Sequence, residues 1–275
     1  DKKGFNEASY RVKEGEDYIL NLSIPHEKKF EAENIPLKIV FEDKYLLIIN
    51  KIAGMVTHPA PGNNHGTLVN ALLNYTNNKL SNINDNNRPG IVHRLDKETS
   101  GLIVVAKNNE VHFNLAEQFK DHSISRKYKA IVWGIPNDQS IEGFIERHKI
   151  NRKKMSLNKN KGKYSETHIS LKKSYGICSI VECLLKTGRT HQVRLHLSSI
   201  NSPVVGDKIY GKNIKNKYIQ NKKTFNKYLI LKNFSRQSLH AYFLAIKHPN
   251  SRKLMKFKTD FPKDIKNLLE MLEKY

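Results

Sequence analysis

The sequence from residue 93 reads His93-Arg94-Leu95-Asp96-Lys97-Glu98-Thr99-Ser100-Gly101 and continues as Leu102-Ile103-Val104-Val105-Ala106. The apolar run is typical of a buried strand, and the Thr-Ser-Gly before it is typical of a turn. Asp96 is thus expected on a turn at the mouth of a strand, two residues after Arg94. A carboxylate held there beside cations suits a nucleophile or a base. The alternative is an Asp that caps a turn and pairs with Arg94 at the surface.

Outward from this stretch, the pattern predicts more strands than helices. Apolar or alternating runs predict strands at residues 37–41, 45–49, 127–135, 176–186, 239–247 and 254–258. Single helices are expected between them: after a Thr67 cap, over residues 110–122, after a Thr190 cap, and after Pro262. An Asn-rich loop is expected at residues 76–90, and an exposed Lys-rich insertion at residues 208–232. Without a βαβ rhythm, this order predicts an α+β fold with a mostly antiparallel sheet.

Composition points to a polyanionic partner. The 275 residues carry 48 Lys and Arg against 26 Asp and Glu, a formal net charge of +22. Nucleic acid is the leading candidate, although a biased genome composition would also enrich lysine. No apolar run approaches the ~20 residues of a membrane span, so no membrane partner is expected. Cys178 and Cys183 lie five apart on a predicted strand and face opposite sides, which fits a reducing cytoplasm. No Cys/His spacing predicts a metal site.

The stretch at residues 93–101 resembles the HRLDxxTSG motif of the RluA family of pseudouridine synthases, and other segments match that family in order. They are residues 47–59 (LIINKIAGMVTHP), 66–73 (GTLVNALL), 126–130 (RKYKA), 187–194 (TGRTHQVR), 205–211 (VGDKIYG) and 236–241 (RQSLHA). Ile52 departs from the pattern, since the family has Pro there. The lost proline affects the rigidity of a turn more than the chemistry.

The resemblance implies a pseudouridine synthase fold, in which a long, bent, mixed sheet with flanking helices carries a cleft across its middle. The catalytic domain is expected over residues 30–275. Residues 1–29 resemble the tail of an S4-like RNA-binding module and are expected to form an arm. The natural protein is therefore expected to be longer at its N-terminus.

The implied reaction is an isomerisation that breaks the N1–C1′ bond of uridine, turns the uracil and forms a C5–C1′ bond. It needs no cofactor and no metal. Positive charge develops on the sugar as the base departs, as in glycosidases, so a carboxylate near C1′ and C2′ is needed. By resemblance this is Asp96. Whether it adds to C1′ or removes a C2′ proton stays open.

The other implied site residues each have a second interpretation. Arg189 is expected to pair with Asp96, or else to bind an RNA phosphate. Tyr128 is expected to stack on the flipped uracil, or else to be a core aromatic. His58 either touches the substrate or has no special role, and His240 is expected in the core. The residues expected to contact RNA are Arg94, His58, Arg126, Lys127, Thr190, His191, Gln192 and Arg194.

The expected function is a cytoplasmic, monomeric RNA pseudouridine synthase. The resemblance is strongest to the large-subunit rRNA branch called RluD-like, which implies the helix 69 loop of 23S rRNA, free or in the assembling large subunit. A RluC-like choice of other uridines and a tRNA substrate are the alternatives. From other classes, the alternatives are a non-catalytic ribosome-assembly RNA-binding protein, an N-glycosidase and a nuclease.

Overall fold

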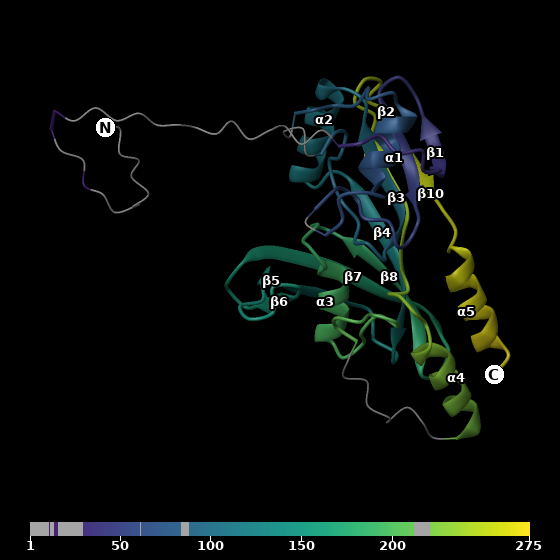
Figure 1. Cartoon of the computed structure of the whole chain (residues 1–275). Helices are drawn as coiled ribbons and strands as arrows, with labels where there is room; N and C mark the ends of the chain where they lie inside the picture. The colour runs from purple at the N-terminus through teal and green to yellow at the C-terminus, as the bar shows by residue number, and fades with distance from the viewer. Residues whose placement is uncertain (1–10, 12–13, 16–29, 61, 84–87, 212–220) are drawn as a thin grey trace.

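A computed structural model describes residues 11, 14–15, 30–60, 62–83, 88–211 and 221–275 (Figure 1). Within them, ten strands form one sheet with five helices around it. The strands are β1 (Ile39–Glu42), β2 (Leu46–Lys51), β3 (Ser100–Ala106), β4 (Ser125–Trp133), β5 (Gln139–Arg147), β6 (Met155–Asn158), β7 (Lys163–Ser174), β8 (Cys178–Leu185), β9 (Leu239–Lys247) and β10 (Leu254–Lys258). The helices are α1 (Leu68–Tyr75), α2 (Asn109–Lys120), α3 (Gln192–Ser199), α4 (Lys222–Lys232) and α5 (Lys263–Glu273).

The sheet is mixed and mostly antiparallel, which confirms the predicted α+β class. Its order is β1-β2-β3-β9-β4-β8-β7-β5-β6, with β10 paired to β9 beside this path. The pair β3 and β9 is parallel, and every other pair is antiparallel. Gly101 lies in this parallel pair at φ +121°, where a Cβ would meet the backbone of Ala241 at 2.3 Å. The Gly of the Thr-Ser-Gly turn thus lets the two halves of the sheet join.

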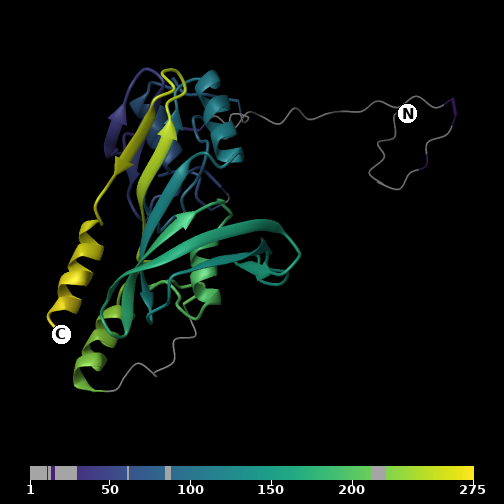
Figure 2. The same cartoon turned by 180° about the vertical axis from the view of Figure 1, so that it is seen from behind.

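Alternating side chains give the first half of the sheet two buried faces. Leu47 and Ile49 of β2 belong to one core cluster, with α1, whereas Leu46 and Ile48 belong to a second cluster, with α2. A third cluster around Trp133 is covered by α4 and α5. Figures 1 and 2 show β5, β6 and β7 projecting to one side of this body. We call residues 139–174, which these strands span, the finger.

Several predicted elements occur with small changes of boundary, and others were missed. Thr67 caps α1 as expected, and Pro262 is the residue before α5. The three finger strands were not predicted. Residues 208–232 are not wholly an exposed insertion, because α4 occupies their end and buries Leu231. The S4-like arm falls almost wholly on residues outside the described ranges, as does part of the Asn-rich loop.

The two cysteines and His240 have the expected places. Cys178 and Cys183 are free and buried in different core clusters, on opposite faces of the sheet. His240 is buried, with its Nδ1 2.9 Å from the Ser100 hydroxyl and its Nε2 3.0 Å from the Thr259 hydroxyl. Within the described residues, no helix is both long and apolar enough to cross a membrane.

Candidate active site

Asp96 lies at the junction of two cavities. Its backbone carbonyl accepts from the Thr99 N–H at 3.0 Å, which closes the turn that leads into β3. One cavity has a volume of about 500 Å³ and the other about 50 Å³. The residues that line both are Arg94, Leu95, Asp96, His191 and Arg194. The Asp96 side chain is 19% exposed, so it is held by the protein and still open to a ligand.

The partner of Asp96 is Arg194, from the first turn of α3. Arg194 Nη1 donates to Asp96 Oδ2 at 2.8 Å. Its other edge donates to Asp207, from Nε to Oδ2 at 2.7 Å and from Nη2 to Oδ1 at 3.0 Å. The Arg194 side chain is only 4% exposed. Arg194 was expected to contact RNA, but both of its guanidinium edges here serve carboxylates of the protein.

Arg189 does not make the predicted pair with Asp96. It lines the smaller cavity, but its Nε donates to the Tyr164 carbonyl at 2.9 Å. Its backbone N–H donates to Gln192 Oε1 at 2.9 Å, which turns the chain just before α3. This leaves Arg189 at the root of the finger, and its alternative interpretation, a phosphate contact, stays a prediction.

Neighbouring residues of β4 face opposite sides of the sheet. Tyr128 lines the smaller cavity and is also part of the core, so its core position does not exclude the predicted stacking on uracil. Burial raises the pKa of its hydroxyl to about 12. Lys127 faces the other side, where it pairs with Glu182 at 3.3 Å, so it cannot reach this cavity. Arg126 shares the Tyr128 face but is buried, and a Cβ on Gly188 would collide with its guanidinium.

The two residues just before α3 differ in what they offer a ligand. Thr190 is exposed. The sequence predicts that it caps the helix, but in the structure it does not. The residue before α3 is His191, at φ +58° and without a side-chain cap. His191 Nε2 lies 3.9 Å from Asp96 Oδ2, and its Nδ1 lies 3.0 Å from the Tyr210 hydroxyl. Burial lowers the pKa of His191, and the charge of Asp96 opposes this only in part. The neutral ring is therefore favoured.

The Gln192 amide is hydrogen-bonded within the protein, although the residue was expected to contact RNA. It is buried, and its Oε1 accepts from the Thr187 hydroxyl at 2.8 Å and from the Arg189 N–H. Its Nε2 donates to the Glu166 carbonyl at 3.0 Å and to the Thr167 hydroxyl at 2.9 Å. Every hydrogen-bonding site of the amide is thus used inside the protein.

Arg94 and His58 complete the predicted set. Arg94 is exposed and lines both cavities, where it can meet a ligand. His58 is buried, and burial together with the charges of Arg94 and Arg88 lowers its pKa to about 4. It is therefore neutral at neutral pH, and it lines neither cavity around Asp96.

Two residues with evident roles here were missed in the sequence. Lys51 is fully buried, and its Nζ donates to the carbonyls of Ile52 and Met55 at 2.8 Å and of Lys97 at 3.2 Å. It ties the loop after β2 to the Asp96 turn, and burial lowers its pKa to about 7. The other is Asp207, the second carboxylate on Arg194. Its motif was recognised, but nothing in the spacing assigned it to Arg194.

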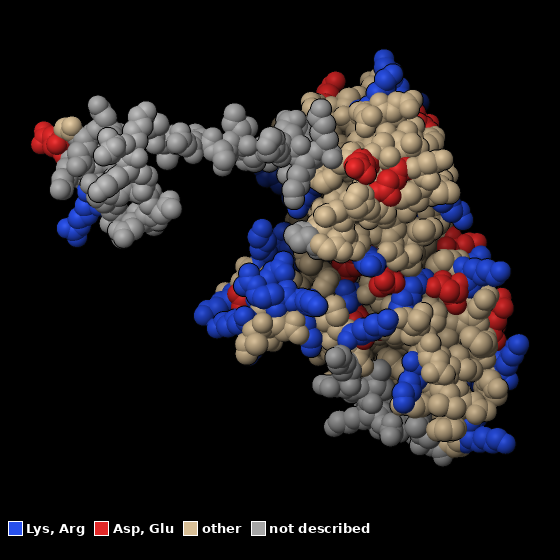
Figure 3. Space-filling model, viewed as in Figure 1, with Lys and Arg blue, Asp and Glu red and all other residues tan. Residues whose placement is uncertain are grey.

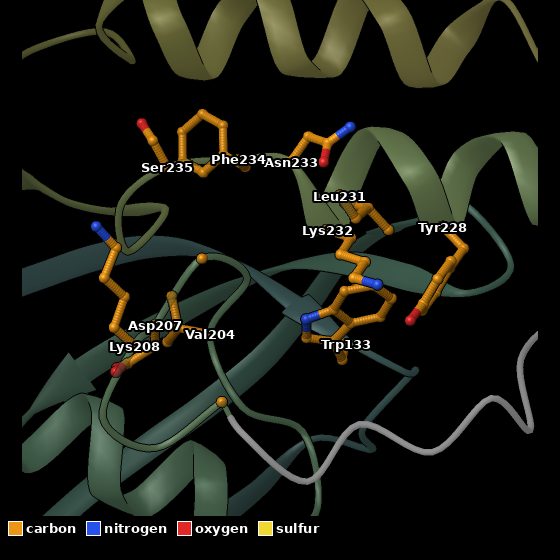
Figure 4. A pocket seen from close by; sticks show the side chains of 12 residues that line it. Trp133, Val204, Asp207, Lys208, Tyr228, Leu231, Lys232, Asn233, Phe234 and Ser235 are labelled. Atoms are coloured by element: carbon orange, nitrogen blue, oxygen red, sulfur yellow. The ribbon is translucent and has the colours of Figure 1, made fainter.

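Figure 4 shows a further pocket of about 560 Å³. It lies next to the 500 Å³ cavity beside Asp96. Gly206 and Lys208 line both, so their loop separates the two spaces. Trp133 and Tyr228 form one aromatic part of its wall, with ring centroids 5.7 Å apart. The Asp207 loop thus forms the wall between the two spaces.

The assembled site offers a fixed carboxylate and a neutral phenol across a narrow cavity. Arg194 and His191 both approach Oδ2 of Asp96, at 2.8 and 3.9 Å, which leaves Oδ1 for a substrate. Apolar side chains of Leu185, Val193 and Leu239 form part of the wall. Such a site suits a planar ring held against apolar atoms, with a negative charge at its edge.

The fold is shared with solved structures of low sequence identity. Human RNA Pseudouridylate Synthase Domain Containing 4 superimposes with a TM-score of 0.63 at 22% identity, over 86% of this chain and 93% of that one. Human RNA Pseudouridylate Synthase Domain Containing 1 gives 0.62 at 22% identity, over 87% and 96%.

Sequence comparison finds closer relatives. The chain is 44% identical over 270 residues to a ribosomal large subunit pseudouridine synthase D of Zymomonas mobilis, covering 97% of this chain and 82% of the relative. It is 38% identical to an uncharacterized RNA pseudouridine synthase of Bacillus subtilis, covering 97% and 83%. The family model described as RNA pseudouridylate synthase matches residues 45–199, which include the Asp96 turn, Tyr128 and Arg194. The chain therefore belongs to the RNA pseudouridylate synthase family, whose reaction is the isomerisation of uridine to pseudouridine in RNA.

Proposed function

We propose that this enzyme modifies uridines of large-subunit ribosomal RNA, with Asp96 as the carboxylate that acts on the sugar. The observation that carries the proposal is the Asp96 side chain, fixed by Arg194 at 2.8 Å and yet open to two cavities. The choice of RNA rests on relatives named as large-subunit enzymes, at 44% and 41% identity in Zymomonas mobilis and Nitrosomonas europaea. We expect it to act as a monomer in the cytoplasm, with the helix 69 loop of 23S rRNA as its target.

In this proposal the target uridine leaves its stack and enters the cavity beside Asp96. The glycosidic N1–C1′ bond breaks while the carboxylate faces the sugar, either bonding to C1′ or taking the C2′ proton. The detached uracil turns between Tyr128 and the apolar wall, and C5 bonds to C1′ while the bond from Asp96 to C1′ breaks or the C2′ proton returns. The C5 proton is then lost and N1 gains a proton. Atoms and charges balance without an oxidant or a second substrate. Arg194 holds the carboxylate in one orientation throughout.

The experiment that tests the proposal is a map of pseudouridine in rRNA and tRNA. RNA is compared from cells with the gene, without it, and with an Asp96→Asn copy. We expect pseudouridine to disappear from large-subunit rRNA in the last two strains and tRNA to be unchanged. Loss at tRNA positions alone would overturn the rRNA assignment. An unchanged map with a defect in subunit assembly would favour the non-catalytic alternative.

Substitutions at Tyr128 separate the role of its ring from that of its hydroxyl. Tyr128→Phe keeps the flat face and is expected to bind RNA as the wild type does. The pKa of the hydroxyl is raised to about 12, so the hydroxyl stays protonated at neutral pH. If this hydroxyl transfers a proton in the reaction, Tyr128→Phe is expected to bind RNA but turn over slowly. Tyr128→Ala is expected to lose about 1–3 kcal/mol of RNA binding. Filter binding and single-turnover rates measure the two effects.

A buried tyrosine outside the site provides the control for Tyr128. Tyr175 is equally buried but belongs to the α4 and α5 cluster. Tyr175→Ala is expected to lower the melting temperature without changing RNA affinity. If Tyr128→Phe and Tyr128→Ala both behaved as the wild type, Tyr128 would have no part in the pocket.

The finger is the proposed surface for the RNA backbone. Residues 147–163 contain eight Lys or Arg and no Asp or Glu. Figure 3 shows these cations gathered over the projecting finger. They are Arg147, Lys149, Arg152, Lys153, Lys154, Lys159, Lys161 and Lys163, and all but Lys154 are exposed. The root of the finger meets the site, since Tyr164 accepts from Arg189 and Met155 N–H donates to the Tyr210 hydroxyl at 2.8 Å.

Neutralising part of the finger should weaken binding through charge alone. In a variant with Lys153→Gln, Lys159→Gln and Lys161→Gln, we expect the log–log slope of affinity against salt to fall by about 2 to 3. The modified uridine should stay the same, because phosphate contacts position RNA without reading it. Affinity over a salt series measures the slope.

The Lys-rich stretch at residues 208–232, which the sequence favours for phosphate contacts, provides the comparison. Residues 212–220 of it lie outside the described ranges, so the control uses α4. A variant with Lys222→Gln, Lys223→Gln and Lys232→Gln loses the same charge and is expected to keep the slope. The opposite result would move the backbone surface from the finger to α4.

A further inference from the structure

Asp207 is a buried charged residue of the site. It lies in the loop after α3, and its side chain has no exposed surface. Both of its oxygens accept hydrogen bonds from Arg194, at 2.7 and 3.0 Å. Such a two-point contact fixes the plane of a guanidinium as well as its distance. Once the plane is fixed, Nη1 of Arg194 points in one direction, and in that direction lies Asp96.

Asp207 is itself anchored to its own loop. Its Oδ1 also accepts from the backbone N–H groups of Ile209 at 2.9 Å and Tyr210 at 3.1 Å. Burial raises the pKa of Asp207, but the bonds and the charge of Arg194, together with these two N–H groups, hold it below the ordinary value. The carboxylate therefore stays charged at neutral pH and cannot turn away from Arg194.

The loop is also fixed against the rest of the protein. Gly206 has φ +76°, and a Cβ there would lie 1.9 Å from the Arg236 carbonyl oxygen. Tyr210, three residues after Asp207, binds His191 and the finger through its hydroxyl. The support of Arg194 is thus a rigid loop with contacts on both sides.

Charge balance gives Asp207 a second effect on Asp96. Arg194 is one buried positive charge shared by two carboxylates. If Asp207 were neutral, the whole charge of Arg194 would act on Asp96 and hold it more tightly. With Asp207 ionised, the three groups together keep one negative charge, which a nucleophile or base requires.

We propose that Asp207 is a positioning residue for the isomerisation, because it aims Arg194 at Asp96 and shares its charge. This inference rests on the proposed function of Asp96. Asp207 touches neither the substrate nor the reacting atoms, and it acts only through Arg194.

The test is Asp207→Asn, which separates charge from shape. The Asn Oδ1 can still accept from Ile209 and Tyr210, so the loop keeps its bonds. Its NH₂ group, however, faces a donor edge of Arg194, and the negative charge is gone. We expect the single-turnover rate on a target RNA to fall on the order of 100-fold, as for a misplaced catalytic group. RNA affinity should stay within about twofold, since the finger and the cavity are untouched.

A second Arg–Asp pair, in which the arginine is buried and the carboxylate is exposed, provides the control. Arg236 donates to Asp264 from Nε at 2.6 Å and from Nη2 at 2.9 Å, in the same forked geometry. Asp264→Asn is expected to lower the melting temperature without changing the single-turnover rate. If Asp207→Asn also lowered only the melting temperature, or lowered rate and affinity together, Asp207 would be a structural residue and the inference would fail.

Two further variants keep the test decisive. Asp207→Glu retains the charge and displaces the fork, so we expect a folded protein with a rate between those of the wild type and Asp207→Asn. It replaces Asp207→Asn if that variant does not fold, and a wild-type rate in Asp207→Glu would then overturn the inference. Asp96→Asn is measured beside them. Activity in Asp96→Asn would reject the proposed function, whereas its inactivity with a fully active Asp207→Asn would reject only the role of Asp207.

Discussion

Asp96→Asn is expected to abolish turnover while leaving RNA affinity within a few-fold of the wild type. The amide keeps the shape of the side chain and can still accept from Arg194 Nη1. It lacks the negative charge that either role at the sugar requires, so a loss of several orders of magnitude is expected. Release of tritium from C5-labelled uridine in a target RNA measures turnover, and filter binding measures affinity.

Glu98→Gln is the charge control for this result. Glu98 lies in the same turn, two residues after Asp96, and its backbone carbonyl accepts from Arg236 at 3.1 Å. Its side chain makes no ion pair with Arg194 within the described residues. We expect Glu98→Gln to keep most of its turnover. Substantial turnover in Asp96→Asn would remove Asp96 from the chemistry, whatever the control shows.

Arg194→Met should lose both activity and stability. Without the guanidinium, Asp207 becomes a buried carboxylate without its cation, and breaking such a pair costs about 3–5 kcal/mol. Urea unfolding measures this loss. Asp207 contributes stability above the ordinary carboxyl pKa of 3.8, because its folded pKa is lower, and that contribution disappears as the pH falls through the folded value. The gap in unfolding free energy between wild type and variant should therefore narrow at acidic pH.

The double variant Arg194→Met with Asp207→Asn distinguishes the two losses. Its buried charges are both gone, so part of the lost stability should return. Turnover should not return, because nothing then holds Asp96. A gap that stays constant across pH, or a double variant no more stable than Arg194→Met alone, would show that the instability has another origin.

Much of the sheet could be predicted from the sequence because its strands are buried on one or both faces. Residues 239–247 and 254–258 are strands with the predicted bounds, since apolar residues run through or alternate along them. The finger strands were missed for a physical reason. All four residues of β6 are half-buried, and β7 ends in three exposed residues. Because the finger projects into solvent, its strands show only a weak alternation of apolar and polar residues.

The arginine of the site shows where sequence reasoning stops. Arg189 and Arg194 lie in one motif, and spacing alone does not say which of them reaches Asp96. The choice depends on the left-handed backbone of His191 and on the Gln192 amide, which turn Arg189 toward Tyr164. The side of the sheet that Lys127 faces could have been predicted from the sequence. Neighbouring residues of a strand face opposite sides, and Lys127 is next to Tyr128.

The position of β9 in the sheet has a consequence for the order of folding. Chain synthesis delivers β3 and β4 early, but they become neighbours only through β9, whose residue His240 is 140 residues after its partner Ser100. Until residues 239–247 arrive, two strand edges stay open, and open edges invite pairing with other chains. Closing so long a loop is slow compared with local pairing. Asp96 and Tyr128 lie on either side of this closure, so the enzyme is expected to acquire its catalytic centre as one of its last folding events.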